Sequence, residues 1–223
     1  MESKKPLVSI IMNCYNSDQF LKEAIESAYS QTYLNWEIVF WDNASSDNSA
    51  NIAKSYDDRI KYYSTSETSS LGDARNLAMK KVSGKYVTFL DCDDLFLPEK
   101  LQKQVDLMEA LKLPLCYGSS IIINESGVEI KRPKVKNKSG YIFDRLLNKY
   151  EISMNTVMIE YNYLVEQNLS FSNNLYYCPD YDLFMEVCSR SEVCVIHDFI
   201  GKYRSHKNSL SSKTLDLAPY EVK

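Results

Sequence analysis

The distribution of apolar residues in the first half of the chain predicts alternating strands and helices. Residues 7–12 form a continuous apolar, β-branched run, which is typical of a strand buried on both faces. Between residues 18 and 31 the apolar positions recur at helical spacing, and Asn16 or Ser17 is available as the N-cap. A strand, a loop and a helix in this order form half of a βαβ unit.

The same alternation continues to residue 111. We expect further strands over residues 36–41, 60–63 and 85–90, and helices over residues 48–55, 72–82 and 99–111. The last helix follows Pro98, a residue favoured where helices begin. Such alternation predicts an α/β fold with a Rossmann-like, mostly parallel central sheet flanked by helices.

The pattern changes after Pro114. Residues 117–123 and 128–130 flank a Gly-containing segment of hairpin length, so we expect a small antiparallel excursion in the second half. Residues 182–189 are predicted to be helical, and residues 193–196 and 199–203 to be strands. Because no repeat or low-complexity linker interrupts the chain, we expect residues 1–223 to form a single domain.

Composition narrows the class of protein. With 44% hydrophobic and 12% aromatic residues, the chain can bury a large core. The net charge of −4 gives no reason to expect a nucleic-acid partner, because such binders usually carry a basic surplus. The six cysteines include no C-x-x-C pair and are expected to be reduced. A helix that spans a bilayer needs about 18 consecutive apolar residues, and no run in this sequence approaches that length. We therefore expect a cytoplasmic protein, with the inner membrane surface as a further location.

Polar clusters follow three of the first four predicted strands, at residues 13–16, 42–47 and 91–94. In open α/β sheets, ligands collect at the carboxyl ends of the strands. The alternative is ordinary loops with capping Asp and Asn, which predicts scattered single residues. Three clusters at one edge of a sheet favour a binding site.

The densest cluster is Asp91-Cys92-Asp93-Asp94. Three carboxylates in four residues repel one another, and a divalent cation would offset that repulsion. Mg²⁺ and Mn²⁺ accept carboxylate oxygens and often complete their coordination with substrate phosphates. The alternative is that Asp93 and Asp94 only cap the helix that begins near Pro98, and we expect one of the three aspartates to have that role.

Five segments resemble family 2 glycosyltransferases of the GT-A fold in their order and spacing. They are Val8-Ser9-Ile10-Ile11-Met12 with Tyr15-Asn16, Asp42-Asn43-Ala44-Ser45-Ser46-Asp47, Gly72-Asp73-Ala74-Arg75-Asn76, Ser83-Gly84-Lys85-Tyr86 and Phe89-Leu90-Asp91-Cys92-Asp93-Asp94. The likeness is dense from residue 6 to about residue 111. It implies a nucleotide-diphospho-sugar donor, with UDP favoured, and a Mn or Mg cation.

The resemblance also implies roles for individual residues. Residues 1–111 would bind the nucleotide sugar, and residues 112–223 would bind the acceptor and supply the catalytic base. Asp42 would contact the nucleobase, Tyr15 and Asn16 would line the nucleoside pocket, and Asp93 would be the principal metal ligand. The donor-binding residues implied are Cys14, Tyr15, Asn16, Asp42, Arg75, Asp91 and Cys92, and the metal ligands are Asp93 with Asp91 and His206 as further candidates. For Arg75, a surface salt bridge is the alternative.

The resemblance implies an inverting transfer, which needs a base to remove the proton of the acceptor hydroxyl. In the family this base belongs to a Glu-Asp element before a helix. Here Pro179 replaces the Glu and Asp180 matches the Asp, so we expect Asp180 to be the base, with Asp182 in reserve. A helix N-cap is the alternative for Asp180.

Two basic segments complete the candidate site. Residues 203–211 resemble a family element that closes over the donor diphosphate, where Arg204 or Lys207 could neutralise charge and His206 could bind metal or phosphate. A solvated histidine is the alternative. The basic run at residues 131–138 is either a solvated loop or a contact with anionic lipid or a lipid-linked acceptor.

The function expected from these observations is transfer of a sugar from a nucleotide diphosphate to a saccharide or lipid-linked acceptor of surface polysaccharide synthesis. One alternative is another metal-dependent nucleotidyl or phosphoryl transferase, but the sequence contains neither of the common Gly-rich phosphate loops. The other is a sugar-nucleotide binding module without catalysis, which Pro179 keeps open. The sequence does not indicate the oligomeric state.

Overall fold

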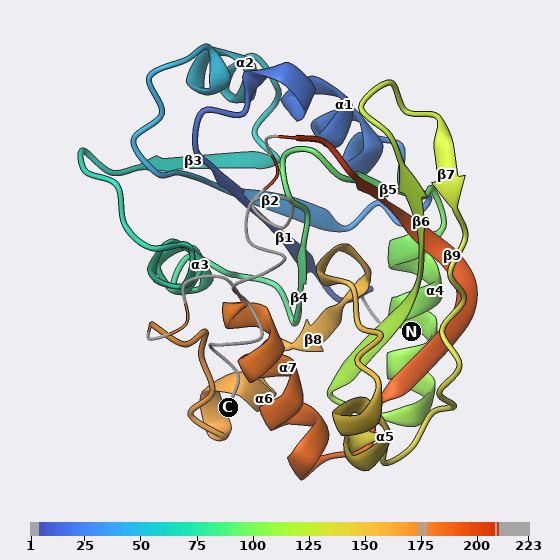
Figure 1. The fold of residues 1–223 in the computed structure, drawn as a ribbon. Helices are drawn as coiled ribbons and strands as arrows, with labels where there is room; N and C mark the ends of the chain where they lie inside the picture. Colours follow the sequence, from blue (N-terminus) through green and yellow to red (C-terminus); the bar gives the residue numbers. More distant parts are fainter. Residues whose placement is uncertain (1–4, 174, 176–177, 208, 210–223) are drawn as a thin grey trace.

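The computed structural model describes residues 5–173, 175, 178–207 and 209. The first half is an alternation of strands and helices, as predicted (Figure 1). Its elements are β1 (Val8–Cys14), α1 (Asp18–Tyr29), β2 (Trp36–Asp42), α2 (Ser49–Lys54), β3 (Ile60–Ser64), α3 (Leu71–Met79) and β4 (Tyr86–Phe89). The strands pair in parallel in the order β3-β2-β1-β4. The register places Cys14 opposite Asp42, so the first two polar clusters begin side by side.

The second half extends the same sheet with shorter and mixed elements. They are β5 (Leu95–Phe96), α4 (Lys100–Leu111), β6 (Leu115–Ile123), β7 (Glu129–Lys131), α5 (Phe143–Asn148), the 3-10 helix η1 (Met154–Thr156), β8 (Met158–Glu160), α6 (Tyr161–Glu166), α7 (Pro179–Arg190) and β9 (Cys194–Arg204). Beyond β4 the order is β8-β6-β9-β5, with β7 paired to β6.

The predicted antiparallel excursion is confirmed and is larger than expected. Besides the β6–β7 hairpin, β8 is antiparallel to both β4 and β6, and β5 is antiparallel to β9. The two strands expected near the C-terminus are one continuous strand, β9, which runs parallel to β6. The polar pair His197-Asp198 interrupts the apolar pattern of β9, and the register with β6 shifts near Ser119 at the same level.

Two hydrophobic clusters cover the two faces of the sheet. One contains Ile11 and Phe89 with residues of α3 and α7, and the other contains Ile10 and Phe40 with residues of α1 and α4. The two tryptophans at positions 36 and 41 are buried, as their strand positions predict. Each cluster includes residues from both halves of the chain, so the two halves pack together on both faces of the sheet.

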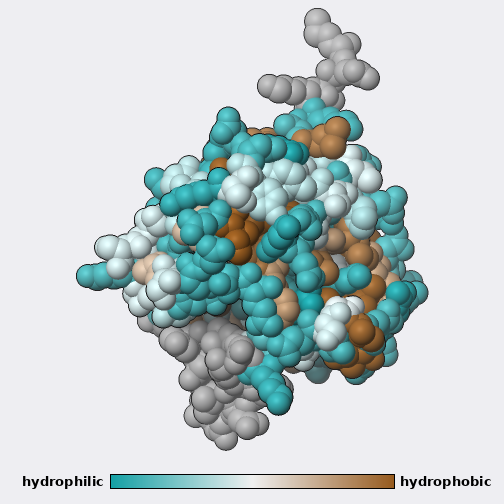
Figure 2. Space-filling view, turned by 90° about the horizontal axis from the view of Figure 1, so that it is seen from above, coloured by the Kyte–Doolittle hydropathy of each residue, from teal (hydrophilic) through white to brown (hydrophobic). Residues whose placement is uncertain are grey.

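The surface is mainly polar on the face shown in Figure 2, where hydrophobic side chains show between hydrophilic ones in separate patches. In the part of the chain that the structure describes, no helix combines the length and the apolar character needed to cross a membrane. In the basic run from Lys131 to Lys138, every lysine is exposed.

Candidate active site

The loops after β1 and β2 are locked together by Asn16. Its backbone φ is +48°, a conformation that Asn tolerates better than most residues. Asn16 Oδ1 accepts a hydrogen bond of 2.8 Å from the Ser46 backbone N–H, and the Asn16 N–H donates to Ser45 Oγ at 3.1 Å. The neighbouring residue Tyr15 is 55% exposed. The two polar loops therefore form one rigid rim with an open aromatic ring beside it.

Asp42 is buried at the end of β2 and serves as a double acceptor. Its Oδ1 accepts from the Ser45 N–H at 2.8 Å, and its Oδ2 accepts from the Tyr62 hydroxyl at 2.6 Å. Burial and the neighbouring Asp42 raise the pKa of Tyr62 to about 12, so the proton stays on the tyrosine oxygen. These contacts fix the orientation of the Asp42 carboxylate.

Cys14 and Cys92 lie beneath the polar loops with buried side chains. The Cys92 thiol donates to the Asn13 carbonyl at 3.3 Å. The neighbouring Cys92 side chain is the main reason that the pKa of Cys14 is lowered to about 7, and burial acts in the opposite direction. The thiols therefore support the loops from below, while their proposed contact with a donor stays a prediction.

The three aspartates after β4 have different surroundings. Asp94 is 2% exposed, and its Oδ1 accepts the backbone N–H of Arg204 at 2.8 Å. Burial, together with the charges of Asp93 and Asp91, raises the pKa of Asp94 well above its usual range. Asp91 and Asp93 keep 38% and 29% of their side chains exposed. Asp94 is thus a structural acceptor, and the other two carboxylates are accessible to a ligand.

Arg75 of α3 brings carboxylates from the two halves together. The side chain is 5% exposed, with Nη2 at 3.3 Å from Asp91 Oδ1 and Nη1 at 3.7 Å from Asp180 Oδ1. It lies over the ring of Phe171, 5.4 Å from the centroid. Nη1 has no hydrogen-bond partner within the described residues. Arg75 is therefore a buried clamp rather than a surface ion pair.

Asp180 lies in the first turn of α7, directly after Pro179. Its side chain is 26% exposed. Burial raises the pKa of Asp180 above the ordinary value, with Arg75 lowering it and Asp91 raising it in turn. Asp182, the reserve candidate, is exposed in the same turn. A partly desolvated carboxylate beside a cation fits a base better than an exposed one does.

Close packing of α3 against α7 sets the position of Asp180. A Cβ added to Gly72 would lie 2.5 Å from the Ser172 carbonyl oxygen and 3.6 Å from Pro179 Cβ. The Asn76 side chain bonds both the carbonyl and the N–H of Phe171, at 2.9 and 3.0 Å. The structure thus explains the glycine at position 72: a side chain there would push α3 away from the segment at Ser172 that precedes α7.

The candidate cation site has two predicted ligands close to each other. His206 Nε2 lies 2.9 Å from Asp93 Oδ2, and His206 Nδ1 is buried without a hydrogen-bond partner among the described atoms. No three His, Cys, Asp or Glu side chains converge on one point in the described ranges. A carboxylate and an imidazole suit Mn²⁺ or Mg²⁺ when substrate phosphates supply further oxygens. Asp91 is paired with Arg75 instead.

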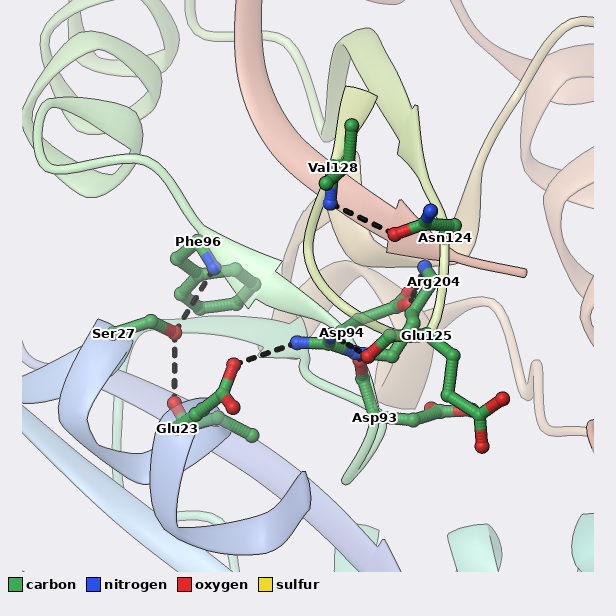
Figure 3. Close-up of polar contacts among 10 residues, drawn as sticks. Glu23, Ser27, Asp93, Asp94, Phe96, Asn124, Glu125, Val128 and Arg204 are labelled. Atoms are coloured by element: carbon green, nitrogen blue, oxygen red, sulfur yellow. Dashed lines mark hydrogen bonds and ion pairs between the residues drawn. The ribbon is translucent and has the colours of Figure 1, made fainter. Parts of the chain in front are cut away.

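Arg204 has a different position from the one expected of a residue that neutralises a diphosphate. Its side chain is fully buried and donates to Glu23, to the Asp93 carbonyl and to the Glu125 carbonyl (Figure 3). Sequence reasoning did not single out Glu23 or Glu125, because each has the local pattern of an ordinary exposed side chain. Phe171 beneath Arg75 was missed for the opposite reason, since it resembles any core residue.

Comparison with known proteins identifies the family of this chain. The model of the family "Glycosyl transferase family 2" matches residues 9–163. WfgD of Escherichia coli, a UDP-Glc:alpha-D-GlcNAc-diphosphoundecaprenol beta-1,3-glucosyltransferase, is 32% identical over 209 residues, which are 92% of this chain and 80% of WfgD. The chain therefore belongs to glycosyltransferase family 2 and is a transferase.

Solved structures show the same GT-A fold. S. aureus TarS 1-349 in complex with UDP-GlcNAc has a TM-score of 0.78 at 20% identity, over 92% of this chain and 60% of that one. The mannosyltransferase PcManGT from Pyrobaculum calidifontis, in complex with GDP-Man and Mn2+, has a TM-score of 0.72 at 16% identity, over 96% of this chain and 61% of that one. The chain thus spans about three fifths of the length of these structures.

Proposed function

We propose that this glycosyltransferase moves a sugar from a UDP-sugar to a saccharide or lipid-linked acceptor with inversion at the anomeric carbon, using Asp180 as the base. One observation carries the proposal. Arg75 contacts Asp91 of the cluster after β4 and Asp180 at the start of α7. A donor-side carboxylate and a candidate base are therefore held at one point by a shared cation.

UDP is the favoured nucleotide because of the proteins that this chain resembles. WfgD is named for UDP-Glc and TarS was solved with UDP-GlcNAc, whereas PcManGT was solved with GDP-Man. In our proposal Asp42 contacts the nucleobase, and Tyr15 and Asn16 line the nucleoside pocket. The fixed orientation of Asp42 and the exposure of Tyr15 support these roles.

Asp93 and His206 are the residues that would hold a Mn or Mg cation, and Asp91 stays a candidate ligand. Their oxygen and nitrogen donors are 2.9 Å apart, in a cluster that is rich in negative charge. Such a cation, when bound, stabilises negative charge on the departing diphosphate. The Mn2+ in the PcManGT complex is consistent with this choice.

The transfer step follows from the position of Asp180. Its carboxylate accepts the proton of an acceptor hydroxyl as that oxygen bonds to the anomeric carbon. The bond from the anomeric carbon to the diphosphate breaks, and the electron pair leaves on UDP. Arg75 keeps Asp180 oriented, and it favours the ionised carboxylate until the proton is taken up. The raised pKa brings Asp180 closer to the range in which a carboxylate is an effective base.

The acceptor is proposed to be lipid-linked because WfgD is named for a diphosphoundecaprenol acceptor. An acceptor of that kind is held at a membrane surface. The exposed basic run from Lys131 to Lys138 offers positive charge that anionic lipid or a diphosphate would attract. A solvated loop is the alternative for this run.

The proposal is tested by donor turnover in three proteins. Wild type, Asp180→Asn and the matched control Asp182→Asn are incubated with UDP-glucose, Mn²⁺ and a GlcNAc-diphospho-lipid acceptor, and release of UDP and formation of disaccharide are measured. We expect Asp180→Asn to lose about 10²-fold or more in kcat while still binding UDP, and Asp182→Asn to match wild type. Absence of turnover in all three proteins, despite UDP binding, would favour a binding module.

A further inference from the structure

Arg204, the last residue of β9, is a buried cation with three separate acceptors. Its Nε donates to the Asp93 carbonyl at 2.9 Å, its Nη1 to the Glu125 carbonyl at 3.0 Å and its Nη2 to Glu23 Oε2 at 2.8 Å (Figure 3). The guanidinium also lies over the Phe20 ring, 4.5 Å from the centroid. The Arg204 side chain thus joins α1, the turn between β6 and β7, and the loop after β4.

The ion pair alone does not explain why a cation is buried here. Arg204 is 1% exposed at the side chain, whereas Glu23 is 60% exposed and can be solvated without it. Burying a guanidinium costs free energy unless its donors are satisfied, and two of its three partners are backbone carbonyls. The planar guanidinium has N–H donors in fixed directions, so it can donate to such carbonyls at defined angles, whereas a lysine ammonium cannot.

Asp93 connects these contacts of Arg204 with the candidate active site. Arg204 holds its backbone carbonyl, and His206, two residues further along the same segment, lies 2.9 Å from its carboxylate. Between them the Ser205 N–H donates to the Ile123 carbonyl at 2.9 Å, which fixes the end of β9. Rotation of the Asp93 peptide would therefore move its carboxylate away from His206.

We propose that Arg204 is a positioning residue for sugar transfer: by fixing the Asp93 peptide against the β6–β7 turn and α1, it sets the Asp93 carboxylate where the donor diphosphate and its cation are held. This inference rests on the proposed function of Asp93. Arg204 itself does not touch the reacting atoms. Groups that orient a metal ligand typically affect metal affinity or activity by about 10- to 100-fold when they are lost.

The test compares Arg204→Lys with the control Arg190→Lys, which changes an exposed arginine paired with Glu186 on α7. Mn²⁺ binding in the presence of UDP is measured from the free Mn²⁺ signal in electron paramagnetic resonance, and kcat and the donor KM are measured separately. We expect Arg204→Lys to weaken Mn²⁺ binding and to raise the donor KM by about 10-fold or more. Arg190→Lys should match wild type.

A merely structural role for Arg204 gives a different result. It would lower kcat through loss of folded enzyme and leave the donor KM and Mn²⁺ affinity of the folded fraction unchanged, and that outcome overturns the proposal. Should Arg204→Lys not fold, Glu23→Ala removes one acceptor of the same fork at an exposed position. It is expected to raise the donor KM in the same direction but by less, and an unchanged KM would overturn the proposal. Absence of turnover in wild type would instead contradict the proposed function.

Discussion

His206 Nε2 lies 2.9 Å from Asp93 Oδ2, although the two residues are separated by 113 positions in the sequence. The contact brings the segment after β9 onto the carboxylate cluster after β4. A carboxylate and an imidazole at this distance can bind one cation together. This pair is therefore the proposed site of the cation that binds the donor diphosphate.

Asp94 is expected to tolerate a change that Asp93 does not. Asp94→Asn keeps an oxygen that can accept the Arg204 backbone N–H, and it replaces a buried carboxyl group, whose pKa is raised, by a neutral amide of the same shape. We expect Asp94→Asn to fold and to keep a kcat within about threefold of wild type. Steady-state kinetics on this variant provide the check. A loss as large as that of Asp93→Asn would show that Asp94 is itself a ligand.

Replacement of Arg75 by Met is expected to move the pH dependence of transfer. Asp180 acts when ionised, so activity falls as pH drops through its pKa. Arg75 lowers that pKa, and without the cation the already raised pKa of Asp180 rises further. The acid limb of the profile of kcat/KM against pH should therefore shift to higher pH in Arg75→Met and stay in place in Arg190→Met. An unmoved limb in Arg75→Met would exclude Asp180 as the titrating base.

A methyl group at position 72 is expected to disturb both stability and catalysis. The added Cβ would lie 2.5 Å from the Ser172 carbonyl oxygen, so α3 and the segment before α7 must separate. Overpacking of this kind costs about 1–3 kcal/mol, and displacement of Asp180 from Arg75 should lower kcat. Thermal unfolding and kinetics of Gly72→Ala measure the two effects. A variant with wild-type values for both would mean that this close approach has no functional role.

Lys100 is expected to make stability depend on pH in the alkaline range. It is fully buried, donates to Thr88 Oγ1 and Gln104 Oε1, and burial lowers its pKa from 10.5 to about 7. Between these two values the unfolded chain binds a proton that the folded protein does not. The free energy of unfolding should therefore rise with pH over this window, by at most about 1.4 kcal/mol per pH unit.

Urea unfolding of wild type, Lys100→Met and the exposed control Lys22→Met at a series of pH values tests this prediction. The slope should flatten in Lys100→Met and stay unchanged in Lys22→Met, whose side chain is 74% exposed in the native protein. Equal slopes in all three proteins would mean that Lys100 stays protonated when buried.

The parallel half of the fold was predictable because its strands are apolar runs and its helices carry apolar residues at helical spacing. The short strands were not, since β5 has two residues and β8 has three, too few for any pattern to develop. The continuity of β9 was hidden by His197 and Asp198, which lie where its register with β6 shifts. Local sequence carries no record of such pairing between distant strands.

The candidate site was predictable as a set of residue types but not as a set of contacts. Asp91, Asp93 and Asp94 are alike in the sequence, and only the approach of β9 buries Asp94 and leaves the other two accessible. The partners of Arg204 depend on where α1 and the β6–β7 turn meet. The clamp formed by Arg75 depends on the packing of α3 against α7.

The central claim is that Asp93, with His206 beside it, binds the donor diphosphate through a divalent cation. Isothermal titration of UDP into wild type and Asp93→Asn, each with and without Mn²⁺, tests it most directly. The account predicts that Mn²⁺ strengthens UDP binding to wild type and has no such effect on Asp93→Asn. Equal strengthening by Mn²⁺ in both proteins would contradict it.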